Sequence, residues 1–306
     1  MRCCPGQIPP TPTQLVIIDR YSRRVRELTI SDPSSVRFLQ CTSMRPCCLL
    51  PNLMVLQWNP YLLAPYIPII FIQRLLCPTL VSLKATLSEA DGATLLSFLD
   101  NYPLLCRKLK SVDFHFSNGA QSMTTIQALS RAICSQEILE NVVLHTPIDD
   151  ITLRYLSTLP TLKALSVNLS ERSRPRTGSF LPTDPLFCSA EELQFETSEL
   201  NLVTSLLRPR NQTFHTFRLF HHSRLTSEAI VHFFGVLASR SHTKSFQELA
   251  LSTGDFSHPM PADQMENEAT HYQLSYVTLQ PLMVFGSLRV LVIEWSEQIS
   301  LDDTRL

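Results

Sequence analysis

The six residues Leu80-Val-Ser-Leu83-Lys-Ala85 follow the pattern apolar-x-x-apolar-x-apolar, and this pattern decides the fold. In an extended strand alternate side chains share a side, so the fourth and sixth residues face one way and the fifth faces the other. Ten copies of the pattern occur in the chain of 306 residues. They start at Val25, Leu53, Leu80, Leu109, Leu139, Leu162, Ala190, Phe214, Phe246 and Leu288. The sequence therefore predicts ten short strands of one kind.

The spacing of the copies indicates how these strands combine. Successive starts are 23 to 42 residues apart, and most intervals lie between 23 and 30 residues. Repeats of roughly 20–29 residues are typical of leucine-rich repeats, in which stacking buries an apolar face that one copy cannot bury alone. We therefore expect an α/β leucine-rich-repeat solenoid, with a curved parallel sheet on the concave side and helices and irregular segments on the convex side. Residues 1–20 are expected to form an irregular lead-in, and residues 21–306 a single domain of about ten repeats.

The segments between the predicted strands alternate between helical and irregular patterns. Apolar residues at three- and four-residue spacing favour helices over residues 93–99, 125–133, 149–159, 200–207 and 227–237. Two polar stretches, residues 171–185 and 252–272, are expected to be loops. Serine occupies the ninth position of five copies, and Ser88-Glu-Ala-Asp91 resembles a capping box at a helix start.

Composition narrows the classes of protein to consider. A net charge of −1 gives no general attraction to nucleic acid or to an anionic membrane. The most apolar run, residues 62–72, contains two prolines and is shorter than the about twenty residues of a membrane helix. No apolar signal-peptide segment follows Met1, so we expect a cytoplasmic or nuclear protein. The nine cysteines include no Cys-x-x-Cys and are expected to be reduced thiols.

Motifs that carry catalysis are missing from the sequence. We find no Gly-x-Gly-x-x-Gly, no phosphate-binding Gly-x-x-x-x-Gly-Lys and no His-Glu-x-x-His. His221 and His222 are adjacent, and adjacent strand residues point to opposite faces, so they are poorly placed to bind one metal ion. The sequence favours a protein that is not an enzyme and that has no metal or cofactor. The alternative is an enzyme or a catalytic accessory, such as a GTPase activator built on leucine-rich repeats.

Several stretches resemble a known family. Tyr21-Ser-Arg-Arg-Val-Arg-Glu-Leu28 resembles the entry to the repeat region of fungal F-box proteins, particularly those of mushroom-forming fungi. Three further stretches resemble the repeats of that family, namely Leu49-Leu-Pro-Asn-Leu-Met-Val-Leu56, Cys77-Pro-Thr-Leu-Val-Ser-Leu83 and Gly286-Ser-Leu-Arg-Val-Leu291. The resemblance spans roughly residues 20–306.

This resemblance implies a role in ubiquitination. In that family the repeats are similar to platforms that recruit substrate proteins, and an F-box ahead of them docks on the Skp-type adaptor of a cullin ubiquitin ligase. Only about twenty residues precede the first repeat here, too few for an F-box. A Skp-type adaptor is therefore expected as a partner only if an F-box lies upstream. The alternative is a repeat scaffold for protein–protein interaction unrelated to ubiquitination.

The odd-numbered positions of the repeat predict a binding surface. The third, fifth and often the seventh residue of each copy should face away from the core, on the concave side. Six acidic and two basic residues fall at the positions considered, with the acidic excess at Glu192, Glu196 and Glu248. We therefore expect a protein partner with a basic segment, with Phe220 as an apolar anchor. The alternative is that these residues only solvate an exposed sheet. The predicted protein-binding residues are Asp113, His115, His145, Glu192, Gln194, Glu196, Arg218, Phe220 and Glu248.

Overall fold

The computed structural model is an α/β structure with a ten-stranded parallel sheet. It describes residues 11–31, 48–59, 69–117, 122–170, 186–207, 214–223, 225–240, 245–253 and 276–295. Within these residues the order of the strands in the sheet is their order in the chain, from β1 to β10. The chain divides into two compact units, residues 1–146 and residues 147–306.

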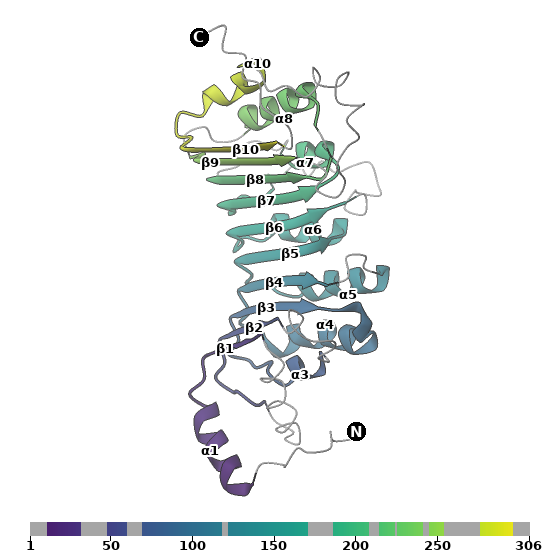
Figure 1. Cartoon of the computed structure of the whole chain (residues 1–306), viewed down its shortest axis with the longest axis vertical. Helices are drawn as coiled ribbons and strands as arrows, with labels where there is room; N and C mark the ends of the chain where they lie inside the picture. The colour runs from purple at the N-terminus through teal and green to yellow at the C-terminus, as the bar shows by residue number, and fades with distance from the viewer. Residues whose placement is uncertain are drawn as a thin grey trace. The chain divides into compact units, whose positions relative to one another are not determined.

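The first unit begins with a helix and contains the first five strands, which lie side by side in chain order (Figure 1). Its strands are β1 (Glu27–Ile30), β2 (Val55–Trp58), β3 (Ser82–Leu87), β4 (Ser111–Phe116) and β5 (Asn141–Pro147). Its helices are α1 (Pro12–Ser22), α3 (Ile70–Gln73), α4 (Ala93–Leu105) and α5 (Met123–Cys134), with the 3-10 helix η2 (Glu89–Asp91).

The second unit continues the alternation of strands and helices. Its strands are β6 (Ala164–Leu169), β7 (Glu192–Thr197), β8 (Thr216–His221), β9 (Glu248–Thr253) and β10 (Val290–Trp295). Its helices are α6 (Asp150–Thr158), α7 (Leu200–Leu206), α8 (Ser227–Arg240) and α10 (Tyr276–Leu279), with the 3-10 helix η5 (Gln280–Val284). The five helices expected from apolar spacing all form, as α4 to α8, and α4 extends six residues beyond the expected end.

Each strand coincides with one copy of the repeat, so the ten predicted strands are confirmed. The fourth residues of successive copies stand in register and form the centre of the core. In the first unit Leu56 pairs with Leu83 and Leu83 with Val112, and all three are fully buried. In the second unit the same row runs from Leu165 through Leu193 and Phe217 to Leu249, again buried. The apolar pattern thus sets both the register and the core within each unit.

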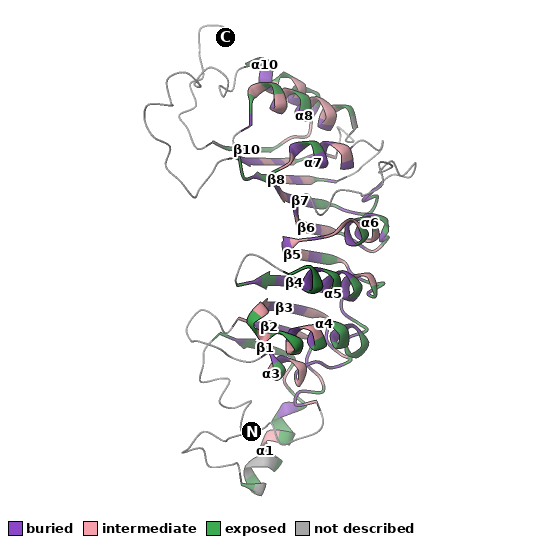
Figure 2. Cartoon of the chain, turned by 90° about the vertical axis from the view of Figure 1, so that its right-hand side faces the viewer, coloured by how far each residue is buried: buried purple, intermediate pink, exposed green. Residues whose placement is uncertain are grey.

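The two faces of the sheet differ in burial. Strand β3 buries Leu83, Ala85 and Leu87 and leaves Lys84 and Thr86 at least partly exposed. Figure 2 shows α4 and α5 in the first unit, and α7 and α8 in the second, on one side of their strands. Within the described residues no helix covers the opposite side, which carries the odd-numbered repeat positions. We call this side the open face of each unit.

The buried pattern continues to the eighth residue of the repeat, beyond the hexapeptide that defines it. This position is apolar in some copies, as at Leu87 and Phe116, and polar but buried in others, as at Thr197, His221 and Thr253. A polar residue is tolerated because it bonds the turn that follows. Thr197 Oγ1 accepts from the backbone N–H of Glu199 at 2.9 Å. The buried residue at the end of the strand is therefore stabilised either by apolar packing or by a side-chain hydrogen bond to the turn.

The predicted capping box forms only in part. Ser88 Oγ accepts from the backbone N–H of Ala90 at 3.2 Å, and the short helix it caps is the 3-10 helix η2. The Asp91 carboxylate accepts from the backbone N–H of Ile69 at 3.4 Å instead of reaching back to Ser88. Gly92 follows with a φ of +49°, a conformation that favours glycine, and it links η2 directly to α4. The reciprocal half of the box therefore does not form, since Asp91 bonds Ile69.

The lead-in differs from its expectation, and the expected loops lie largely beyond the described residues. Helix α1 forms over Pro12–Ser22, where residues 1–20 were expected to be irregular. Proline is favoured in the first turn of a helix, which accounts for the start of α1. Residues 171–185 lie outside the described part, and of residues 252–272 only Ser252 and Thr253 are described, as the end of β9. None of the described helices combines the length and the apolar character needed to cross a membrane.

Candidate protein-binding faces

A cluster of charged and imidazole side chains occupies the open face of the first unit. We call Lys84, Asp113, His115 and His145 the histidine cluster; they come from β3, β4 and β5. Lys84 lies opposite Asp113 in the sheet register, and its Nζ is 2.6 Å from Asp113 Oδ2. His145 Nε2 is 3.6 Å from Asp113 Oδ1, and the rings of His145 and His115 have centroids 5.5 Å apart. Three predicted binding residues, Asp113, His115 and His145, are thus brought together.

The electrostatics of this cluster centre on Asp113. Partial burial raises the pKa of Asp113, but hydrogen bonds and charges from His145 and Lys84 outweigh burial and hold its pKa below the usual value. Because these two partners occupy both carboxylate oxygens, Asp113 adds little net negative charge to the face. The described residues contain no group of three or more His, Cys, Asp or Glu side chains placed to hold a metal ion. The histidine cluster is therefore a compensated polar surface.

The open face of the second unit is more acidic. We call Glu192, Glu196, Glu248 and Glu294 the acidic patch; they come from β7, β9 and β10. Across the sheet Glu192 lines up with Thr216 and then with Glu248. Four residues further along the strands, Glu196 lines up with Phe220, Ser252 and Glu294. The carboxylates thus bracket both sides of a central row that contains Gln194 opposite Arg218.

Two side chains of the second unit already contact carboxylates of the acidic patch. Arg218 contacts Glu248 Oε1 through Nη2 at 2.7 Å and through Nε at 2.9 Å. His222 Nε2 lies 3.1 Å from Glu196 Oε1. Arg218 reaches a residue on the neighbouring strand that is two positions out of register, and His222 directly follows the last residue of β8. Counting charges along each strand therefore overstates the acidity at Glu248, which Arg218 partly neutralises. Glu192 is exposed and pairs with no cation among the described residues. 

Apolar side chains are exposed next to these charges. Phe220 on β8 is 37% exposed, and Val290 and Val292 on β10 are 43% and 38% exposed. All three lie at odd positions of the repeat and therefore on the open face. Phe220 shares a row with Glu196, and Val290 shares a row with Glu248. Val292 lies in the central row, next to Ala250. Strand β9 lies between Phe220 and the two valines, so the exposed apolar side chains flank that strand, next to carboxylates. Apolar side chains beside acidic ones suit a surface that binds a basic, partly apolar segment.

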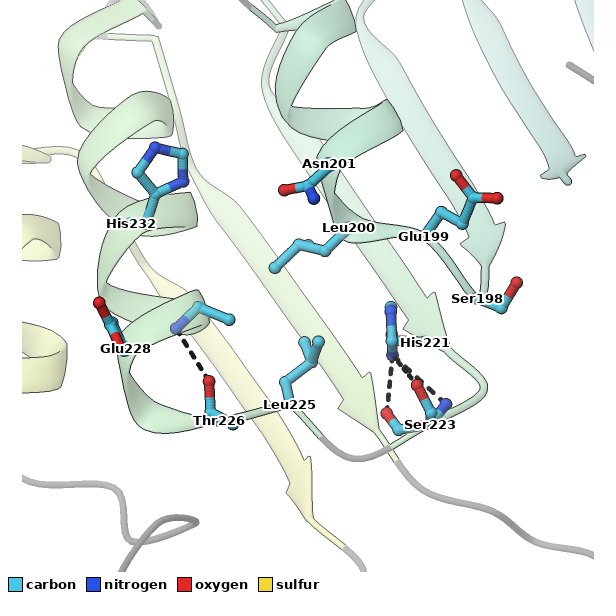
Figure 3. A pocket seen from close by; sticks show the side chains of 11 residues that line it. Ser198, Glu199, Leu200, Asn201, His221, Ser223, Leu225, Thr226, Glu228 and His232 are labelled. Atoms are coloured by element: carbon cyan, nitrogen blue, oxygen red, sulfur yellow. Dashed lines mark hydrogen bonds between the residues drawn. The ribbon is translucent and has the colours of Figure 1, made fainter. Parts of the chain in front are cut away.

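A pocket of about 600 Å³ lies in the second unit, where β7 and β8 end beside α7 and α8. In Figure 3 the side chains of Leu200 and Leu225 lie toward its middle, whereas Glu199 and Glu228 lie toward opposite ends. His221 Nδ1 is 2.7 Å from the carbonyl oxygen of Ser223, and burial lowers the pKa of His221. This histidine is held by the turn that it stabilises. Since the polar groups do not converge on one point, we place the candidate binding site on the open face.

All nine residues that the sequence predicts as binding residues belong to strands β4, β5, β7, β8 or β9, at positions that lie on the open face. The structure brings them together as two groups, three in the first unit and six in the second. The nine predicted residues did not include His222 or Val290, nor Lys84, although the repeat pattern placed Lys84 on the same face. Lys84 and Asp113 both hold the fifth position of successive copies, and this shared position was a signal that they face each other.

Comparison of the chain with models of known protein families and with curated proteins yields no match.

Proposed function

We propose that this protein is a non-catalytic binding module whose open face in the second unit holds a basic, partly apolar segment of another protein. The observation that carries the proposal is the acidic patch together with the exposed Phe220, Val290 and Val292. Four carboxylates and one guanidinium share this described face, so it carries excess negative charge even with Glu248 paired. A surface of one sign raises the local concentration and the association rate of an oppositely charged partner.

Apolar contact would supply the remaining affinity. A charged rim orients the partner and speeds its association, whereas aromatic and aliphatic anchors at the centre give most of the binding energy. Phe220 lies between Glu196 and Ser252 in its row, so an anchor on the partner can pack against it while basic side chains meet the carboxylates on either side. The histidine cluster is compensated, and it is therefore the weaker candidate surface of the two.

We further propose that the bound segment belongs to a substrate of an F-box-type ubiquitin ligase. This rests on the resemblance of the repeats to those of fungal F-box proteins. The second candidate, a repeat scaffold outside ubiquitination, needs only the binding face. Co-purification of the full-length gene product with a Skp-type adaptor would support the first, and its absence together with a stable non-ligase partner would support the second.

The binding face can be tested without knowing the partner. A displayed library of random peptides selected on the folded protein should become enriched in peptides that combine Lys or Arg with aromatic or aliphatic residues. The double variant Glu192→Lys, Glu196→Lys should lose that enrichment, because it replaces two negative charges of the patch with positive ones. Selected peptides should also bind more weakly as salt is raised.

The matched control is Glu191→Lys, Glu228→Lys, which makes the same change of charge in the same unit. Glu191 precedes β7, and Glu228 lies on helix α8; both are exposed, and neither belongs to a strand. This control should select the same peptides as the wild type. If both double variants change the selection equally, net charge alone is responsible and the open face is not the site.

A further inference from the structure

Helix α1 exposes apolar and basic side chains together. Val16 is 68% exposed, Ile17 51% and Tyr21 59%, and Arg20 is exposed as well. Residues four apart stand next to each other on a helix, so Val16 lies beside Arg20. By the same spacing Ile17 lies beside Tyr21. These four side chains form one surface, which is both apolar and positively charged.

The positive charge continues past the end of α1. Arg23, Arg24 and Arg26 are all exposed. We call residues 12–26 the basic segment. It contains four arginines and one aspartate, which leave a net charge of +3, although the whole chain has a net charge of −1. The segment therefore concentrates positive charge at one place in the chain.

Hydrogen bonds hold the end of the basic segment against the residues that precede β2. Asn52 Nδ2 donates to the carbonyl oxygen of Arg23 at 2.8 Å, and Arg26 Nη1 donates to the carbonyl oxygen of Asn52 at 3.1 Å. The guanidinium of Arg24 lies over the Tyr21 ring, 5.8 Å from its centroid, which is a cation–π distance. The segment is thus anchored at its end while its apolar and basic side chains remain exposed.

The acidic patch matches the basic segment in charge, size and apolar content. Its four carboxylates and Arg218 leave a net charge of −3, with histidine counted as neutral, against +3 for the segment. The patch extends from β7 to β10, which is three steps between strands or roughly 14 Å. The eleven residues of α1 make a helix about 16 Å long. Phe220 and Val292 are exposed on the face, as Ile17 and Tyr21 are on the helix.

We propose that the basic segment of one copy of this chain docks on the acidic patch of a second copy. The inference rests on the proposed function, because the segment has the basic, partly apolar chemistry assigned there to the partner. The two surfaces differ, so a copy that has docked its segment still offers its own patch, and association grows with concentration. A partner protein must displace the segment of the neighbouring copy. Self-association thus regulates access to the face.

A second copy suits the basic segment better than an anionic membrane does. A helix that lies in a membrane surface keeps its cations on the side opposite its apolar residues. In α1 the two kinds are mixed, since Arg20 stands beside the exposed Val16. A protein face on which carboxylates alternate with apolar side chains can meet such a mixture, and the acidic patch with Phe220 is a face of this kind.

Sedimentation velocity of the full chain at several concentrations tests the association. At low salt we expect the average mass to rise with concentration, and at high salt to return to that of one copy. The segment variant, Arg20→Glu with Arg23→Glu, reverses two exposed charges of the basic segment. The patch variant, Glu192→Lys with Glu196→Lys, reverses two charges of the acidic patch. Each should weaken association by at least about tenfold.

A mixture of the two variants distinguishes a specific contact from a loss of folding. The patch variant keeps an intact basic segment, and the segment variant keeps an intact acidic patch. An equimolar mixture should therefore associate although neither variant associates alone. The matched control is Arg107→Glu with Lys108→Glu, two exposed residues between α4 and β4, and it should associate as the wild type does. A mixture that remains as single copies would overturn the proposal.

Peptide binding separates a failure of this inference from a failure of the proposed function. The segment variant keeps the acidic patch, so selected basic peptides should bind it more tightly than the wild type at concentrations where the wild type associates. If the wild type stays a single copy at every concentration yet still selects basic peptides, self-docking is wrong and the proposed function stands. Binding to phosphatidylserine vesicles that the segment variant loses, without any self-association of the wild type, would identify a membrane contact instead and overturn the proposal.

Discussion

Arg218 directs two donors, Nε and Nη2, at a single carboxylate oxygen, Oε1 of Glu248 on the adjacent strand. The two residues are not opposite each other, since Arg218 pairs with Ala250 and Glu248 with Thr216 in the sheet register. The guanidinium thus crosses the face diagonally and offsets one carboxylate of the acidic patch. Any basic partner of this face must compete with Arg218 for Glu248 or use the other carboxylates.

Removing this internal competitor should strengthen the binding of a basic segment. For Arg218→Gln we expect the affinity for a selected basic peptide to rise about threefold, because exposed charge pairs contribute up to about 1 kcal/mol. The effect should shrink as salt is added, since it is electrostatic. Fluorescence anisotropy with a labelled peptide at two salt concentrations measures both quantities.

Arg131→Gln is the control for that change. Arg131 forms an exposed pair with Asp100 at 3.2 Å, and both residues belong to helices of the first unit. The variant removes the same charge away from the face and should leave peptide affinity unchanged. Weaker binding by Arg218→Gln would mean that Arg218 itself contacts the partner, and the acidic patch would then not be the dominant feature.

Asp113 should stabilise the first unit in a pH-dependent way. Its pKa is lowered in the folded protein, so its contribution is present above the unfolded value of about 3.9 and is lost as the pH falls through the folded value. We expect Asp113→Asn to lower the free energy of unfolding at neutral pH by about 1 kcal/mol, after allowance for the exposure of Lys84. Urea titrations should show this difference disappear in strong acid. A difference that persists there would trace to lost packing. Asp100→Asn, at an exposed pair, should have little effect at any pH.

The fold could be predicted because the repeat fixes it at many points at once. Leu83 and Leu249 lie in different units, and both occupy a fully buried fourth position of the pattern. The lead-in could not be predicted in this way, because α1 precedes the first repeat and the spacing carries no information about it. The eighth position also escaped notice, since Leu87 fills it by packing and Thr197 fills it by bonding the turn. Apolar and polar side chains can both be buried at this position, so a search for apolar residues alone does not find it.

The residues of the open face could be predicted as a set, whereas the interactions among them could not. Alternation along a strand predicts that Glu248 faces outward. Its pairing with Arg218 depends on side-chain length, because the two residues lie on neighbouring strands and are two positions out of register. Residues beyond the strand, such as His222, fall outside any argument from alternation.

His221 should make the second unit less stable as the pH falls below neutral. Burial lowers its pKa in the folded protein, so its stabilising effect is complete above the unfolded value of about 6.5 and declines as the pH falls toward the lower folded value. We expect His221→Gln to remove much of the loss of stability between about pH 7 and pH 5, a window above that of Asp113. The glutamine amide can still donate to the carbonyl of Ser223, which His221 contacts at 2.7 Å. Urea titration at several pH values tests this. The exposed His232 provides the control, and His232→Gln should retain the acid sensitivity of the wild type.

Replacing Tyr102 by phenylalanine should stabilise the protein. Its side chain is fully buried in the first unit, and its hydroxyl has no hydrogen-bond partner among the described residues. Its ring packs 5.6 Å from that of Phe98 and 5.5 Å from that of Phe114, contacts that phenylalanine keeps. A buried hydroxyl without a partner costs about 1–3 kcal/mol, so we expect Tyr102→Phe to raise the free energy of unfolding by about 1 kcal/mol.

Thermal and urea unfolding measure this change, and Tyr21→Phe is the control because Tyr21 is exposed. Burial also raises the pKa of Tyr102, so its phenol should stay protonated in alkali until the first unit unfolds, and absorbance at the phenolate band should report that step. If Tyr102→Phe destabilises the protein, the hydroxyl is satisfied by a buried water molecule. In that case the variant would leave the water's other partners unbonded, and the loss should be of the same size as the expected gain.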